Sequence, residues 1–220
     1  MTPTAGTGMQ WTKRASAAGL MLVLAASAPA LAQCAQGAEY KQAEAVKQRY
    51  PDPPVRFDTP AFAPDKAGFT THAEMMAYLE ALAARAGNML VRTAGWSQEG
   101  RVLPMLVFTN SRRFGPAELQ RLNRPIVVLV GQLHGNEPAG GEAMLALAKA
   151  LAEGELRPLL DRITVVIMPR ANPDGAHYFW RGTASCIDVN RDHLKVDLPE
   201  TAALRRMTNE LPPDVFVDAH

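Results

Sequence analysis

Two short segments combine histidine with carboxylate side chains at spacings that could hold a metal ion. One is His134-Gly135-Asn136-Glu137, and the other is Asp218-Ala219-His220. Two histidines and one glutamate, with a fourth position left for water or substrate, form a known type of catalytic zinc site. The helical His-Glu-x-x-His motif of other zinc proteases is absent from the chain. The candidate chemistry is therefore hydrolysis at a zinc ion bound by His134, Glu137 and His220.

Each segment alone has a simpler interpretation. A His-x-x-Glu pair arises often by chance, and a histidine at a strand end is commonly a hydrogen-bonded structural residue. Placement strengthens the metal hypothesis, because each segment directly follows an apolar run. Gly135 would let the chain turn sharply, so that His134 and Glu137 converge on one point.

Apolar runs and helical patterns predict the elements that must position these residues. Runs over 125–130, 163–168 and 215–217 are typical of buried strands in a parallel sheet. Helices are expected between them, over 138–154 and 199–211. This alternation predicts an α/β fold with a mixed, largely parallel central sheet and helices on both faces. In such sheets, ligand sites lie beyond the carboxyl ends of the strands.

The preceding part of the chain predicts one more helix and a strand pair. A capping box at 71–74 starts a helix that Gly87 ends, and we expect His72 in its first turn to be solvated. Strands over 89–94 and 102–109 follow, and 111–124 is a polar connection. Prolines make 33–69 an arm, extended after a short helix near 39–49.

The N-terminus predicts export. Lys13 and Arg14 precede a short apolar run, and Ala30-Leu31-Ala32 fits a signal-peptidase site, so 1–32 is interpreted as a signal peptide. A membrane anchor would need about 20 apolar residues. Gln33 argues against a lipid anchor on Cys34. We expect a periplasmic or secreted protein, in which Cys34 and Cys186 form one bridge or remain thiols.

Composition excludes some partner classes. The chain of 220 residues has 23 basic and 22 acidic side chains, a net charge of +1, and 47% hydrophobic residues. This balance gives no electrostatic case for nucleic acid, nor for a membrane surface after signal cleavage.

Several motifs together carry a resemblance to a known family. His134-Gly135-Asn136-Glu137-Pro138 resembles the zinc motif of the carboxypeptidase A-like metallocarboxypeptidases, and the match extends over 70–220. In the same order follow segments similar to the family's later motifs: Asn172-Pro173-Asp174-Gly175, Trp180-Arg181, Asp188-Val189-Asn190-Arg191 and Asp218-Ala219-His220. Gly95–Arg101 resembles the hairpin that precedes the zinc motif.

The resemblance implies a role for each matched residue. His134, Glu137 and His220 would bind Zn²⁺, Asp188 would hydrogen-bond the first zinc histidine, and Arg181 would stabilise the charge that develops on the scissile carbonyl. Asn190 and Arg191 would hold the substrate's terminal carboxylate, for which a guanidinium is well shaped. Arg170 is an extra cation, and we expect its role to be structural.

The resemblance also leaves alternatives open. No residue matches the family's general-base glutamate, so we expect that residue beyond His220 and interpret 70–220 as the N-terminal part of a catalytic domain. The predicted activity is removal of C-terminal residues from peptides. A related deacylase acting on N-acyl amino acids, and a non-catalytic zinc or peptide-binding module, are the alternatives.

Overall fold

A computed structural model describes residues 42–51, 54 and 56–220. The expected signal peptide, 1–32, and Cys34 lie outside the described residues and stay predictions. In the part that is described, no helix has the length and apolar character needed to cross a bilayer.

One five-stranded sheet forms among the described residues, in the order β1-β2-β4-β3-β5. Strand β3 pairs in parallel with β4 and with β5, whereas β2 runs antiparallel to both of its neighbours. The mixed sheet is as predicted, with its parallel part confined to β4, β3 and β5. The strands are β1 (Met89–Trp96), β2 (Val102–Phe108), β3 (Ile126–Val130), β4 (Thr164–Met168) and β5 (Val215–Asp218).

The long helices begin where the sequence predicts them. Thr71 and Glu74 form the expected capping box at the start of α2, with Glu74 accepting from the Thr71 amide at 2.7 Å. Two short helices, α3 and α5, were missed, because five or six residues are too few to show helical periodicity. The α-helices are α1 (Glu44–Arg49), α2 (His72–Arg85), α3 (Pro116–Arg121), α4 (Pro138–Ala152), α5 (Pro173–His177) and α6 (Pro199–Glu210); 3₁₀ turns span η2 (Pro60–Phe62), η3 (Arg157–Asp161) and η4 (Val189–Arg191).

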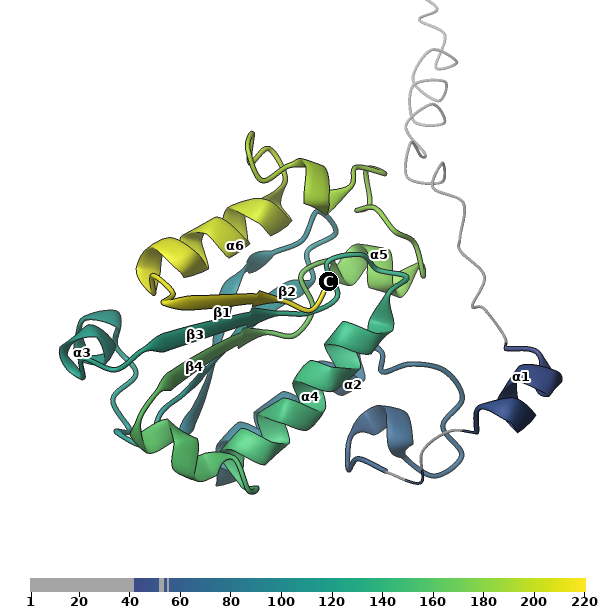
Figure 1. The fold of residues 1–220 in the computed structure, drawn as a ribbon. Coiled ribbons are helices and arrows are strands. Elements are labelled where there is room, and N and C mark those ends of the chain that lie inside the picture. The colour runs from purple at the N-terminus through teal and green to yellow at the C-terminus, as the bar shows by residue number, and fades with distance from the viewer. Residues whose placement is uncertain (1–41, 52–53, 55) are drawn as a thin grey trace, which may run out of the picture. The chain divides into compact units, whose positions relative to one another are not determined.

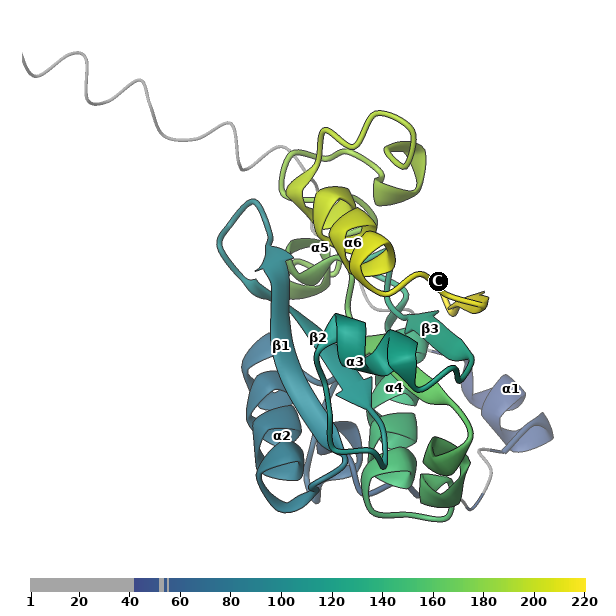
Figure 2. The same ribbon diagram turned by 90° about the vertical axis from the view of Figure 1, so that its left-hand side faces the viewer.

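Helices cover both faces of the sheet, as expected (Figures 1 and 2). Val165 and Ile167 of β4 pack into a core with α2 and α4, while Val166 and Met168 pack into a second core with α3 and α6. Successive strand residues point to opposite faces, so a strand buried on both sides must be apolar throughout. This double burial explains the unbroken apolar run in β4.

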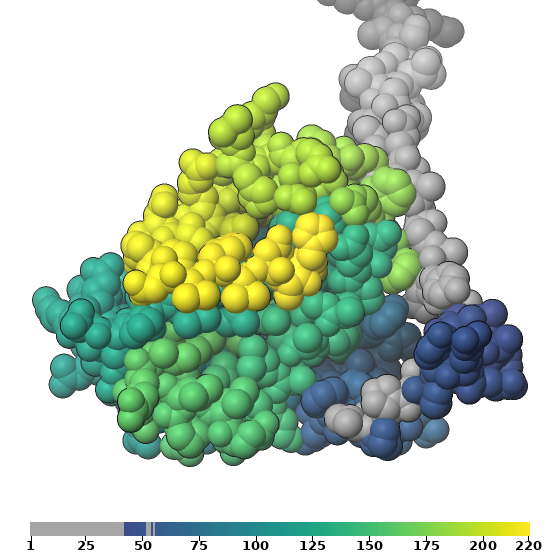
Figure 3. All heavy atoms as spheres, viewed as in Figure 1, coloured from purple at the N-terminus to yellow at the C-terminus, as the bar shows by residue number. Residues whose placement is uncertain are grey.

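Strand β5 departs from the prediction of a buried strand. Val215, Phe216 and Val217 keep 49%, 47% and 39% of their surface exposed, and this segment lies at the surface in Figure 3. The reason is its edge position, since among the described residues β5 pairs only with β3. Its carboxyl end nevertheless carries His220 to the same edge of the sheet as the residues after β3.

Candidate metal centre

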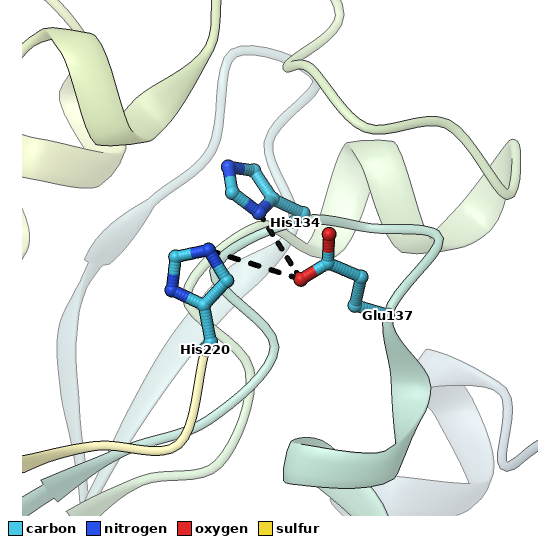
Figure 4. A group of neighbouring side chains, drawn as sticks. All are labelled: His134, Glu137 and His220. Carbon is cyan, nitrogen blue, oxygen red and sulfur yellow. Dashed lines mark hydrogen bonds and ion pairs between the residues drawn. The ribbon is translucent and has the colours of Figure 1, made fainter.

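The three metal-ligand candidates converge. One donor atom from each of His134, Glu137 and His220 fits within a group no more than 4.8 Å across. His134 Nδ1 lies 3.2 Å, and His220 Nε2 3.9 Å, from the same oxygen of Glu137 (Figure 4). Two ligands of a tetrahedral zinc ion with bonds of about 2.0–2.2 Å lie roughly 3.3–3.6 Å apart. The donor types therefore fit zinc, and the donor atoms lie near the spacing that zinc requires, with His220 somewhat further from Glu137 than His134 is.

Burial differs among the three side chains. His134 is completely buried, whereas the side chains of Glu137 and His220 are 38% and 42% exposed. One ligand is thus fixed in the protein interior, and the other two border solvent. Such an arrangement leaves an accessible side for a substrate, as a catalytic metal site requires.

The turn that carries His134 and Glu137 is packed directly on another turn. A Cβ placed on Gly135 would lie 1.9 Å from the carbonyl carbon of Gly175, in α5. Gly135 does not have a positive φ. Glycine is needed here for close backbone approach, and not for the sharp turn that the sequence suggested.

A buried pair of polar side chains supports the same turn from inside. Gln132 donates to the carbonyl of Gly135 at 3.0 Å and accepts from Arg170 Nε at 2.6 Å. Arg170 also donates to the Thr70 carbonyl at 2.7 Å. These contacts agree with the structural role expected of Arg170. Gln132 was missed, although a polar residue between a buried strand and His134 was a usable signal.

Asp188 fixes the orientation of the buried histidine. Its Oδ1 lies 2.9 Å from His134 Nε2 and accepts the Asn190 amide at 2.8 Å. Burial raises the pKa of Asp188, but hydrogen bonds from His134 and Asn190 lower it by more. The pKa of this carboxyl group therefore lies below its usual range. The carboxylate is therefore an acceptor, so Nε2 carries the proton and Nδ1 is left as the metal donor.

Arg181 lies against the same group of side chains. Its Nη1 is 2.8 Å from the second oxygen of Glu137, and its Nε is 3.2 Å from Asp188. The structure thus brings together five of the predicted site residues: His134, Glu137, Asp188, Arg181 and His220. A guanidinium so close to a metal ligand can also reach a substrate oxygen that approaches the metal.

The other two predicted residues lie one turn further on. Asn190 and Arg191 are in η4, directly after Asp188. Arg191 is exposed, and among the described residues its hydrogen bond goes to the carbonyl of Asn190, at 3.0 Å. Its guanidinium is therefore free for a ligand, and no contact ties it to the metal ligands.

The segment 172–175 positions the loop that bears Arg181. Asn172 caps α5 by accepting from the Gly175 amide, and its Nδ2 donates to the carbonyls of Arg181 at 3.2 Å and Gly182 at 2.9 Å. The sequence predicted only that this segment matches a family motif. Its side chains act by joining the exit of β4 to the arginine loop.

Asp174 joins the site to the β1–β2 hairpin. This fully buried carboxylate accepts from Ser97 Oγ at 2.6 Å, from the Glu99 amide at 2.9 Å and from Arg101 at 2.7 Å. Gln98, in the same hairpin, exchanges two hydrogen bonds with Ser185, at 2.9 Å each. The hairpin therefore braces both α5 and the loop between Arg181 and Asp188.

The expectation for His72 was wrong. The side chain is partly buried, and its Nδ1 is buried without a hydrogen-bond partner among the described residues. Burial, followed by the charges of Arg170 and Arg101, lowers its pKa to about 4. Position in the first helical turn suggested solvation, but packing against the exit of β4 overrides it.

Two histidines and a glutamate after the parallel strands, with an arginine from the loop beyond α5 beside them, form the arrangement expected of a metallopeptidase. The model of the zinc carboxypeptidase family matches residues 75–210, more than half of the chain, and the chain belongs to this family. The resemblance drawn from the motifs is confirmed.

Individual relatives agree with this assignment. Carboxypeptidase 2 of Trichophyton rubrum is 34% identical over 162 residues, which cover 72% of this chain and 30% of the relative. The chain thus spans less than a third of that protein's length. A metallo-carboxypeptidase from Burkholderia cenocepacia has a TM-score of 0.57 at 24% identity, over 66% of this chain and 39% of that one. A metallo-carboxypeptidase from Pseudomonas aeruginosa, in complex with (2-guanidinoethylmercapto)succinic acid, has a TM-score of 0.52 at 22% identity. The match covers 66% of this chain and 38% of that one. These structures share the fold.

Proposed function

We propose that this chain forms part of an exported zinc carboxypeptidase that releases C-terminal residues from peptides. The observation that carries the proposal is the placement of Arg181 on Glu137, beside two histidines whose metal-facing nitrogens point at the same carboxylate. A structural zinc site would surround the ion with four protein ligands. Here the described residues offer three ligands, and the remaining side of the group borders solvent and Arg181.

A bound zinc ion would polarise the scissile carbonyl and lower the pKa of its water to near 7. The chain's own residues then supply orientation and charge. Arg181 donates to the carbonyl oxygen as negative charge develops there, and loss of one such donor typically costs about 10²–10³ in rate. Asp188 keeps His134 in the tautomer that leaves Nδ1 free, and Asp218 accepts from the His220 amide at 2.8 Å.

Asn190 and Arg191 determine the exopeptidase character. An enzyme that cuts one residue from a chain end must recognise that end, and a guanidinium matches a carboxylate with two parallel hydrogen bonds. The exposed guanidinium of Arg191 supports this role. So does a structural neighbour that was solved with a succinic acid derivative. The substrate is then a peptide with a free C-terminal carboxylate.

The carboxylates nearest to the metal ligands are already engaged. Asp188 holds His134 and Arg181, and Asp218 lies 3.3 Å from His220 Nδ1. We therefore assign none of them as the general base that accepts the proton of water.

The test compares one peptide in three forms on the native protein loaded with zinc: free C-terminus, C-terminal amide, and the corresponding N-acyl amino acid. Cleavage of the free peptide, at least about 100-fold faster than of the amide, is expected. Arg191→Gln should remove most of this preference, while Arg205→Gln, a similarly exposed arginine, should preserve it. Equal cleavage of the amide would reject the carboxylate clamp. Preference for the N-acyl amino acid would make the protein a deacylase, and zinc binding without any cleavage a binding module.

A further inference from the structure

Arg170 is a buried cation without a buried anion to match it. The residue is 4% exposed, and its hydrogen bonds go to two neutral oxygens, Gln132 Oε1 and the Thr70 carbonyl. Among the described residues it forms no ion pair. Glu142, which binds the amide and hydroxyl of Thr70 at 2.7 and 2.8 Å, and Glu74 act on its charge only from a distance. Removing a charge from water is costly unless a partner compensates it.

A cavity of about 290 Å³ lies directly beside this guanidinium. Arg170 and His72 line it together with Thr71, Ala176, Phe69 and Phe179, where α5 contacts α2. Water occupies about 30 Å³ per molecule in the liquid, so the space holds a polyatomic ligand with some water. Phe69 and Phe179 stack at 6.1 Å and form an apolar wall, which reduces screening of the charge.

Hydrogen-bond donors toward this cavity outnumber their partners. A guanidinium has five N–H groups, and those of Arg170 beyond its two hydrogen bonds have no acceptor among the described residues. The cavity further borders the N-terminal turn of the 14-residue helix α2, where the helix dipole favours negative charge.

We propose that this cavity binds an oxyanion, a carboxylate or a phosphate, with Arg170 as its counter-charge and the start of α2 as its second donor group. The cavity contains none of the three candidate metal ligands, but Gly135 and Pro138 of their turn line it. Arg170 also holds Gln132, which holds the carbonyl of Gly135. A bound anion would therefore stabilise the turn between His134 and Glu137. The inference is independent of the proposed peptidase activity.

The first experiment titrates the native protein with inorganic phosphate and follows its unfolding temperature, with chloride at equal ionic strength as the reference. A ligand that binds only the folded state raises this temperature in a saturable way. Arg170→Gln should weaken the phosphate response at least about tenfold in Kd. Arg191→Gln, which removes a different anion-binding group, should keep the wild-type response. Loss of the response in Arg191→Gln and its retention in Arg170→Gln would overturn the proposal.

A second variant covers the case that Arg170→Gln does not fold. Ala176→Leu fills the cavity while every charge is kept, and it should abolish the phosphate response; Ala202→Leu, in α6, is the matched control. A full response in Ala176→Leu would refute the site. Competition distinguishes the two sources of oxyanion. A peptide with an aspartate side chain and an amidated C-terminus that displaces phosphate indicates a peptide carboxylate, and failure to displace it indicates a free anion.

Discussion

His134 Nε2 lies 2.9 Å from Asp188 Oδ1, on the side of the imidazole opposite to Glu137. The second histidine repeats this arrangement, since His220 Nδ1 lies 3.3 Å from Asp218 while Nε2 faces Glu137. Each candidate ligand histidine is thus oriented by an aspartate at its other nitrogen. Such outer carboxylates set the tautomer and raise the basicity of the ligand.

Replacing His134 by alanine should remove most of the zinc. The side chain is the buried member of the donor set, and no other described histidine or carboxylate lies in the group. Metal content of the purified variant, measured by atomic emission, checks this against His193→Ala, which changes an exposed histidine. Zinc retained in full by His134→Ala would reject the ligand assignment.

Asp188→Asn should weaken zinc binding about 10–100-fold, the usual cost of losing such a carboxylate. An amide can present its NH₂ group to His134 Nε2 and so stabilise the wrong tautomer. Competition with a chromophoric chelator gives the affinity, and Asp197→Asn, an exposed aspartate, is the control. Equal affinities for the two variants would mean that Asp188 does not orient the histidine.

Gly140→Ala should weaken zinc binding with little change in the unfolding temperature. A Cβ on Gly140 would lie 2.4 Å from the Ala219 carbonyl oxygen and 3.0 Å from that of His220, so the segment that carries the third ligand must move. The exposed edge strand before it can shift at low cost. Gly87→Ala makes only ordinary contacts at 3.6 Å and serves as control. Unchanged zinc affinity in Gly140→Ala would argue against His220 as a ligand.

His72 should make the fold sensitive to mild acid. Its pKa falls from 6.5 to about 4 in the folded state, because burial and nearby arginines oppose its charge. The unfolded state therefore binds the proton more tightly. The stabilisation is complete above pH 6.5 and is lost as the pH falls toward 4. Between pH 7 and 4.5, the unfolding temperature of His72→Gln should fall less than that of the wild type in chloride buffer. If the unfolding temperatures of the two proteins fall by the same amount over this pH range, the pKa of His72 is not lowered by folding.

Export should remove the first 32 residues. The small residues Ala30 and Ala32 favour cleavage before Gln33. Intact-mass measurement of the mature protein from a secreting host should place Gln33 at its N-terminus, and Ala30→Asp should block processing. A mature protein that still carries 1–32 would contradict the prediction.

Long apolar runs made much of the fold predictable. The strands around 126–130 and 164–168 were recognisable because burial on both faces requires apolar side chains throughout. Three metal-ligand candidates were predictable because residues after parallel strands meet at one edge. Contacts between distant segments were not predictable. Ser97 and Asp174, for example, are 77 positions apart, and no local sequence pattern indicates their hydrogen bond. The partial burial of His72 was missed for the same reason.

Three turns of this site approach one another backbone to backbone. A Cβ on Gly135 would meet Gly175 at 1.9 Å, and one on Gly175 would meet the Gly182 carbonyl oxygen at 2.4 Å. The distance between the turn of His134 and Glu137 and the loop of Arg181 is therefore set by contact between backbone atoms. No substitution at these glycines can shorten this distance. Any side chain larger than hydrogen at Gly135 or Gly175 would therefore push apart the residues that these turns bring together.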